Sequence, residues 1–111
     1  MKYLSKKTTI DGITFDSKKE GLHYVELKKL EKQGKISNLE LQPSFLLQEG
    51  FKRDGKKYRP ITYIADFRYI ENGKVIVEDV KSSFTAKDKV YKIKKKLLLY
   101  KYGDFEFREI K

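Results

Sequence analysis

Apolar and polar residues follow two periods along this chain, and the periods predict its helices and strands. A helical pattern runs from Ser17 to Gln33, where Ser17 can cap the first turn and Gly34 can end the last. A second helical pattern covers residues 86–102 and stops at Gly103. Four stretches rich in β-branched and aromatic residues are predicted to be extended: 36–48, 58–70, 75–81 and 105–110. The order helix, three strands, helix, strand predicts one α/β domain over residues 1–111, with a mixed sheet flanked by helices.

Short turns are expected to connect these elements. Asp11-Gly12 predicts a small hairpin over residues 8–15. Residues 50–57 predict either a charged loop or the tip of a second hairpin. Pro43 indicates a strand edge or a bend inside the stretch 36–48.

Asn72-Gly73 is the strongest hairpin signal in the chain, and it aligns the two strands beside it. With a two-residue loop, Asp66 lies directly opposite Asp79, whereas a β-bulge would break this register. Alternation along the strand puts Lys81 on the face of Asp79 and turns Glu78 to the opposite face. The sequence therefore predicts two neighbouring carboxylates with a lysine beside them.

Two facing carboxylates repel each other, and aspartate is unfavourable in strands, so a cation is expected to relieve the pair. Carboxylates bind Mg²⁺ together with water and substrate phosphate oxygens, and Mn²⁺ can substitute for it. Lys81 could hold the attacking water or stabilise the charge that develops on phosphorus. These roles describe hydrolysis of a phosphodiester bond. The alternative is structural: Asp79 and Lys81 form a solvated pair while Asp66 pairs with Arg68.

Glu20, near the start of the first predicted helix, has two interpretations. Ser17 and Glu20 match a capping box, in which the glutamate bonds back to the helix N-terminus. On the helical wheel, however, Glu20 lies on the side of Tyr24 and Leu27, which are expected to face the sheet. We favour the second interpretation, with Glu20 as a metal ligand or a holder of metal-bound water. The single histidine, His23, is expected to be structural or at the surface.

The second predicted helix carries an apolar stripe, expected to pack on the sheet, and many lysines. Lys89, Lys94 and Lys96 flank the stripe and are candidates for contacts with a DNA backbone; the alternative is a solvated face. Thr85 and Gln42 are candidates for contacts with phosphate or metal-bound water, although Gln42 could equally cap a strand end. The stripe consists of Ala86, Val90, Ile93, Leu97 and Tyr100.

Composition narrows the class of partner. Lys and Arg number 26 against 16 acidic residues, a net charge of +10, which favours a polyanion and nucleic acid first. Charge alone also fits ribosome-associated and membrane-surface proteins. The absence of cysteine excludes disulfides, thiolate zinc sites and cysteine nucleophiles. Nothing in the sequence resembles a signal peptide or a membrane span, so we expect no membrane partner and a cytosolic location.

At these acidic positions the chain resembles the PD-(D/E)XK nuclease superfamily, which has the restriction-endonuclease-like fold. The matching positions are Asp66 in Ile64-Ala65-Asp66, the triplet Asp79-Val80-Lys81, and Glu20 on the preceding helix. Ala65 stands where the nominal motif has proline. The runs FDSKKEGLHYVELKKL, LQPSF, ADFRY and VEDVKS, followed by Thr85, look like small nuclease-like proteins of phages and prophages.

The resemblance implies a restriction-endonuclease-like core and a Mg²⁺-dependent endonuclease that cuts DNA, duplex or branched, in the manner of Holliday-junction resolvases. It implies a phage or prophage protein in the cytoplasm of a bacterial host. A homodimer would suit the two symmetric strands of a junction. Two other classes of function stay open: a non-catalytic nucleic-acid-binding protein of phage origin that retains the nuclease fold, and a basic structural protein. Neither explains acidic residues gathered on an apolar hairpin.

Overall fold

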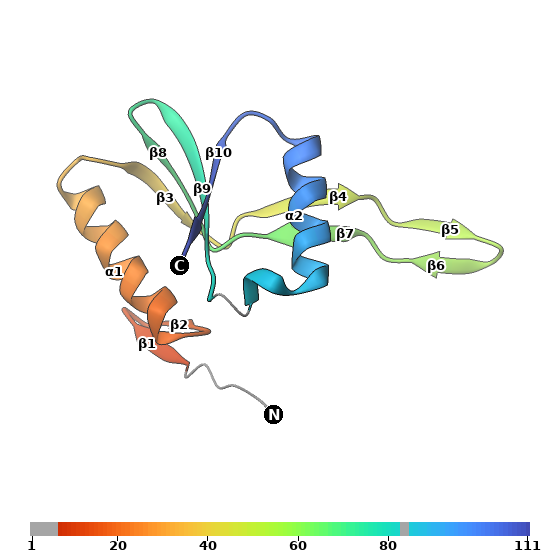
Figure 1. Ribbon diagram of the computed structural model, residues 1–111, viewed down its shortest axis with the longest axis horizontal. Helices are drawn as coiled ribbons and strands as arrows, with labels where there is room; N and C mark the ends of the chain where they lie inside the picture. Colours follow the sequence, from red (N-terminus) through yellow and green to blue (C-terminus); the bar gives the residue numbers. More distant parts are fainter. Residues whose placement is uncertain (1–6, 83–84) are drawn as a thin grey trace.

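The computed structural model describes residues 7–82 and 85–111, and it has a mixed α/β architecture (Figure 1). A four-stranded sheet lies between two α-helices, and three two-stranded ribbons complete the described part of the chain. The elements are β1 (Thr8–Ile10), β2 (Ile13–Phe15), α1 (Lys18–Lys32), β3 (Ser37–Leu41), β4 (Ser44–Gln48), β5 (Phe51–Arg53), β6 (Lys56–Tyr58), β7 (Ile61–Ile64), β8 (Phe67–Glu71), β9 (Lys74–Val80), the 3-10 turn η1 (Thr85–Lys87), α2 (Lys89–Lys101) and β10 (Glu106–Ile110).

The four-stranded sheet has the order β10-β9-β8-β3, with β9 antiparallel to β8 and parallel to β10. The turn at Asn72-Gly73 is confirmed, and the predicted alignment holds from the turn to the pair Phe67–Glu78. The next predicted pair, Asp66 directly opposite Asp79, is wrong. The Asp66 N–H donates to the Glu78 carbonyl oxygen (3.1 Å), one residue out of step, so the regular ladder ends before the two aspartates.

Helix α1 has the predicted bounds, with Ser17 and Gln33 as its caps. Ser17 Oγ accepts the N–H of Glu20 at 3.1 Å, which satisfies one of the free donors of the first turn. The buried face of the helix packs on one face of the sheet, and β1 and β2 close this core at the end near the helix N-terminus. The buried residues of this core are Phe15, Tyr24, Leu27, Ile36, Phe67, Tyr69 and Ile76.

Helix α2 covers the opposite face, because Val77 alternates with Ile76 along β9 and belongs to the second core. It begins later than predicted: Ala86 lies in η1, and Asp88 caps the helix by accepting the Tyr91 N–H at 3.3 Å. The buried residues of this core are Phe45, Tyr63, Ala65, Val77, Tyr91 and Leu98. No helix in residues 7–82 and 85–111 is long and apolar enough to span a membrane.

The predicted packing stripe of α2 is wrong. Leu98 is fully buried, whereas its neighbour Leu97 is 42% exposed. Tyrosine hydroxyls explain the choice of face, since Tyr91 donates to Glu109 on β10 and Tyr102 donates to the carbonyl oxygen of Leu46 on β4 (2.8 Å). The other members of the predicted stripe that lie on α2 are also exposed: Val90, Ile93 and Tyr100.

The stretches 36–48 and 58–70 are each divided, where one extended segment was predicted. Gln42, at φ +53°, separates β3 from β4, and Ala65 and Asp66 separate β7 from β8. The two breaks lie side by side, because the Gln42 N–H donates to the Asp66 carbonyl and the Ala65 N–H to the Pro43 carbonyl, both at 3.0 Å. Strands β4 and β7 thus leave the main sheet together, and residues 50–57 form a hairpin, the second of the two predicted alternatives.

Candidate active site

Asp66 and Asp79 are held together by each other's strands. The Asp66 N–H donates to Asp79 Oδ1 (2.9 Å), and the Val80 N–H donates to Asp66 Oδ2 (2.8 Å). These bonds occupy the place where the regular β8–β9 ladder has ended. The predicted neighbourhood of the two aspartates is therefore present, but it is built by carboxylates that accept backbone N–H groups and not by direct cross-strand opposition.

Asp79 is buried, with 2% of its surface exposed. Its second oxygen, Oδ2, accepts the hydroxyl of Tyr63, which reaches it from β7. Burial, together with the charge of Asp66, raises the pKa of Asp79 to about 6, although the hydrogen bond from Tyr63 works in the opposite direction. The same burial and the nearby Asp79 carboxylate raise the pKa of the Tyr63 hydroxyl, so this group stays a donor.

Glu20 faces the site and does not complete the capping box. Ser17 Oγ accepts the Glu20 N–H, but the Glu20 side chain is 8% exposed and lies against the sheet side of α1. Burial raises the pKa of Glu20 to about 7, and the charges of Asp66, Asp16 and Asp79 add to the rise. Burial also raises the pKa of Asp66, while the bond from the Val80 N–H and the charge of Lys81 lower it. Because the charge of Asp66 is among the causes that raise the pKa of Glu20, the two carboxyl groups are electrostatically coupled.

Lys81 follows β9 directly and is half-buried. Its Nζ lies 4.5 Å from the centroid of the Tyr91 ring, so the ammonium group and the ring form a cation–π interaction. Its charge lowers the pKa values of Glu20, Asp66 and Asp79, so it is electrostatically coupled to all three acids. Its backbone N–H donates to the carbonyl of the residue that ends β10, at 2.7 Å.

Two of the pockets beside Lys81 contain the acidic candidates. One, of about 330 Å³, is lined by Glu20, Asp66 and Thr85 among others. The other, of about 280 Å³, is lined by Asp79, Tyr63 and Lys94 among others. Lys81 lines both pockets and so borders the one that contains Asp66 as well as the one that contains Asp79. The structure thus brings Thr85 and Lys94, as well as the four acid and lysine candidates, to one region.

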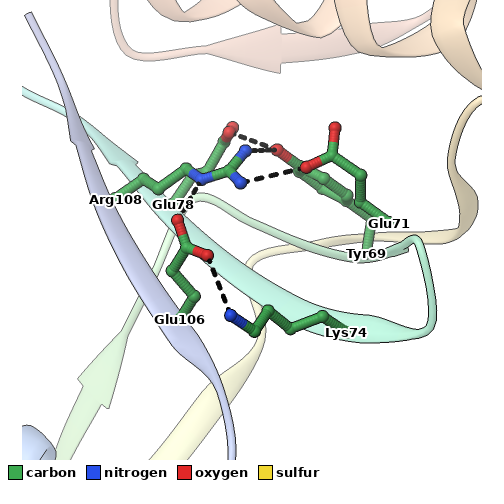
Figure 2. Close-up of polar contacts among 6 residues, drawn as sticks. All are labelled: Tyr69, Glu71, Lys74, Glu78, Glu106 and Arg108. Carbon is green, nitrogen blue, oxygen red and sulfur yellow. Dashed lines mark hydrogen bonds and ion pairs between the residues drawn. The ribbon is translucent and has the colours of Figure 1, made fainter.

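Glu78, the rival acid on β9, belongs to a different structure on the opposite face (Figure 2). Its Oε1 lies 2.6 Å from Nε2 of His23 on α1, and its Oε2 accepts the hydroxyl of Tyr69. Arg108 of β10 donates to the same hydroxyl at 3.4 Å. His23 is therefore structural, as predicted, and Glu78 is turned away from Asp79, as the alternation indicated. The other members of the network in Figure 2 are Glu71, Lys74 and Glu106.

Three predicted residues are not brought to the pockets. Gln42 reaches Asp66 only through its backbone N–H, and its side chain is exposed. Lys89 and Lys96 are exposed on α2 and line neither of the two pockets described above. Lys94, on the same helix, does line the pocket of Asp79.

Sequence reasoning missed two tyrosines that shape the site. Tyr63 donates to Asp79, and Tyr91 supports Lys81. A signal did exist, because a buried carboxylate needs donors and Tyr63 lies in an apolar strand three residues before Asp66. The pattern indicated the opposite for Tyr91, because this residue lies outside the apolar stripe that was predicted to be the buried face of α2.

The donor set fits a hard divalent cation. Glu20, Asp66 and Asp79 are oxygen donors whose combined charge exceeds that of Lys81, and Mg²⁺ commonly takes only one or two carboxylates with waters and phosphate oxygens. Within residues 7–82 and 85–111, no three His, Cys, Asp or Glu side chains are grouped closely enough to hold a metal ion. A cation here would therefore rely on Asp66, which lines a pocket, with one further carboxylate.

Comparisons with known proteins place the chain in a family. Residues 1–111 match the family described as "Protein of unknown function (DUF1064)". The chain belongs to this family. No curated protein and no solved structure matches the sequence. Membership of this family covers the whole chain, so the site and both helices lie inside the region that defines it.

Proposed function

We propose that this protein is a Mg²⁺-dependent endonuclease that hydrolyses phosphodiester bonds in DNA, with branched or recombination intermediates as its natural substrates. The observation that supports this most is the clamp in which Asp79 accepts the backbone N–H of Asp66, and Asp66 accepts the backbone N–H of Val80, the residue after Asp79. It holds two carboxylates at the end of β9, with Lys81 as the next residue but one after Asp79. Burial raises the pKa values of both acids, and raised carboxyl pKa values are common in functional sites.

The arrangement of elements agrees with the proposed restriction-endonuclease-like core. In that core a helix precedes three strands, and a second helix leads to a strand. Here α1 precedes the chain's path through β3, β8 and β9, and α2 leads to β10, which lies beside β9 and parallel to it. The helices cover opposite faces of the sheet. This agreement, with the acid-x-Lys triplet at the end of β9, supports the assignment to the PD-(D/E)XK superfamily.

Asp66 and Glu20 would hold the metal ion in the pocket that they line. When bound, Mg²⁺ or Mn²⁺ would neutralise charge on the scissile phosphate and acidify a coordinated water. Asp79 fixes the backbone of Asp66 through the bond to its N–H, and Tyr63 fixes Asp79. Lys81, held over Tyr91, is placed to orient the attacking water and to stabilise negative charge on the phosphate.

The proposal is tested by incubating the protein with linear, nicked and four-way-junction DNA in the presence of Mg²⁺ or Mn²⁺, with EDTA as the blank. We expect cleavage that requires the metal and that Asp66→Asn and Lys81→Gln reduce by a factor of about 100 or more, the range in which loss of one catalytic electrostatic contact falls. Protein that binds DNA but cuts none of the three substrates would support instead the non-catalytic nucleic-acid-binding function.

Glu78→Gln provides the matched control. Glu78 is the acid next to Asp79 on the same strand, it is buried as Asp79 is, and it faces the opposite core. The substitution removes one carboxylate charge but keeps a side chain that can bond with His23 and Tyr69. If the folded Glu78→Gln protein loses cleavage as completely as Asp66→Asn, the site is not where we place it.

A further inference from the structure

Strands β5 and β6 form an arm that projects from the body of the molecule (Figure 1). Among the described helices and strands, they contact only each other. Every residue from Gln48 to Pro60 is exposed. The arm lies along the longest dimension of the protein, which is 54 Å, and turns at Asp54-Gly55. Four residues, from Phe51 at the base to Asp54 at the tip, correspond to about 13 Å of ribbon.

The arm has a definite shape although it lacks a hydrophobic core. The rings of Phe51 and Tyr58 stack across its base, with centroids 4.8 Å apart and planes inclined by 12°. Gly50 lies against the other strand, where an added Cβ would come within 3.0 Å of the Tyr58 carbonyl oxygen and 3.1 Å of Pro60 Cδ. A two-stranded hairpin alone is marginally stable, so this stacking and close approach set the direction in which the arm leaves the body.

Positively charged residues lie opposite each other across the two strands of the arm. Lys52 lies directly opposite Lys57, and Arg53 lies directly opposite Lys56. Like charges in directly opposed positions destabilise a β-ribbon. The two pairs point to opposite faces, because successive side chains alternate. The arm therefore presents positive charge on both faces. The acidic residue at its tip, Asp54, forms only a long, solvent-exposed ion pair with Arg53 (3.9 Å).

We infer that the β5–β6 arm binds duplex DNA by lying in a groove, with its two basic faces directed at the two phosphate backbones that border the groove. The major groove of B-DNA is about 12 Å wide and admits a two-stranded ribbon. A single strand would engage one face of the ribbon and leave the other like-charge pair unrelieved. This inference rests on the proposed function, because it takes DNA as the substrate.

The arm is continuous with the candidate site. Strand β6 leads through Arg59-Pro60 into β7, and β7 carries Tyr63, whose hydroxyl donates to Asp79. A duplex bound by the arm would thus be connected, through β7 and Tyr63, to the buried Asp79. A competing explanation is that the lysines prevent the exposed strands from pairing edge to edge with another molecule. That explanation requires no DNA.

The test compares the full-length wild type with two triple variants that remove the same charge. The arm variant combines Lys52→Gln, Lys56→Gln and Lys57→Gln; the control combines Lys29→Gln, Lys32→Gln and Lys35→Gln, all exposed at the far end of α1 and beyond it. Binding of a short fluorescein-labelled duplex is measured by anisotropy in EDTA, between about 50 and 200 mM salt. A variant with arginine at the three arm positions checks that charge is what matters.

We expect the arm variant to bind the duplex at least about tenfold more weakly at intermediate salt. Its plot of log affinity against log salt should be shallower by up to about 2.7, as three lost phosphate contacts imply. The control and the arginine variant should match the wild type, and single-stranded DNA of the same length should discriminate less between the proteins. With Mg²⁺, the arm variant should show a raised KM for cleavage and an unchanged kcat.

Two outcomes overturn the inference while leaving the nuclease proposal intact: the arm variant binds and cuts duplex DNA as the wild type does, or the α1 control loses as much affinity as the arm variant. Equal losses on single-stranded and duplex DNA would overturn the groove geometry. A wild type that neither binds nor cuts any DNA would refute the proposed function itself, whatever the arm variant does.

Discussion

Replacing Glu20 by glutamine should make the metal-free protein more stable at pH 8, although it removes a candidate metal ligand. The Glu20 pKa is raised by burial from 4.5 to about 7, with Asp66, Asp16 and Asp79 adding repulsion and Lys81 opposing it. Because the folded-state pKa is raised, the protonated carboxyl stabilises the protein at low pH, and that stabilisation is lost as the pH rises through 7. Glutamine has nearly the same shape and stays neutral throughout.

The size of the effect follows from the two pKa values. Between pH 5.5 and pH 8, a carboxyl with a pKa of about 7 in the folded state and 4.5 in the unfolded state lowers the free energy of unfolding by about 2 kcal/mol. For a domain of this size that corresponds to a fall in Tm on the order of 10 °C. Three acids outside the site, Glu31, Glu106 and Glu109, have lowered pKa values and are ionised throughout this interval.

The assay is urea unfolding followed by circular dichroism, in EDTA, at pH 5.5 and pH 8. The wild type should lose stability over this interval, and Glu20→Gln should lose about 2 kcal/mol less. Glu26→Gln, an exposed position on the same helix, serves as the control and should behave as the wild type. Adding Mg²⁺ at pH 8 should restore stability to the wild type and restore less to Glu20→Gln. Equal pH dependence in the two proteins would refute the placement of Glu20 among the acids of the site.

Three further predictions concern single positions. Tyr63→Phe removes the hydroxyl that donates to buried Asp79 and should lower the free energy of unfolding by about 1.5–3 kcal/mol in urea titrations; an unchanged midpoint would contradict the bond. Leu98→Ala should cost about 2–5 kcal/mol, whereas Leu97→Ala, one residue away and 42% exposed, should cost less than about 1; the reverse order would restore the stripe that periodicity favoured. Gly73→Ala should lower Tm by several degrees, about 1 kcal/mol, because its φ is +75°, and no change would argue against the tight turn.

Local signals in the sequence were enough to predict α1 and the β8–β9 hairpin. Ser17 caps a helix wherever its neighbours allow one, and Asn72-Gly73 adopts positive φ at both positions of a two-residue turn. Both features depend on residues adjacent in the chain. The face of β9 that carries Asp79 followed from the same turn, since the register from the turn to Phe67 fixes which residues alternate.

The β8–β9 pairing ends before Asp66 because of contacts between segments far apart in the sequence, and a local sequence pattern does not predict such contacts. The backbone there bonds with Gln42 and with Glu78, so the chain bends where two separate strand pairs part. A prediction based on the turn alone continues the register by one step too far. The two aspartates still lie side by side, because the Asp79 carboxylate accepts the N–H of Asp66 and the Asp66 carboxylate accepts the N–H of Val80.

The buried face of α2 was missed because the helix has two apolar stripes. The longer stripe has the better helical period, but Tyr91 and Tyr102 gain hydrogen bonds to β10 and β4 only when the shorter one faces the sheet. Periodicity counts apolar residues and gives no weight to hydroxyl partners across the core. The same rotation of the helix brings Lys94 to the pocket of Asp79 and leaves Lys89 and Lys96 in solvent.

The measurement that tests the central claim most directly is the rate of metal-dependent DNA cleavage by wild type, Asp79→Asn and Glu78→Gln side by side, each confirmed to be folded. The two acids are neighbours on β9 and both are buried, but only Asp79 accepts a hydrogen bond from Asp66 with its side chain. The account predicts that Asp79→Asn loses cleavage by a factor of about 100 or more while Glu78→Gln retains it. Equal rates for Asp79→Asn and the wild type would contradict it.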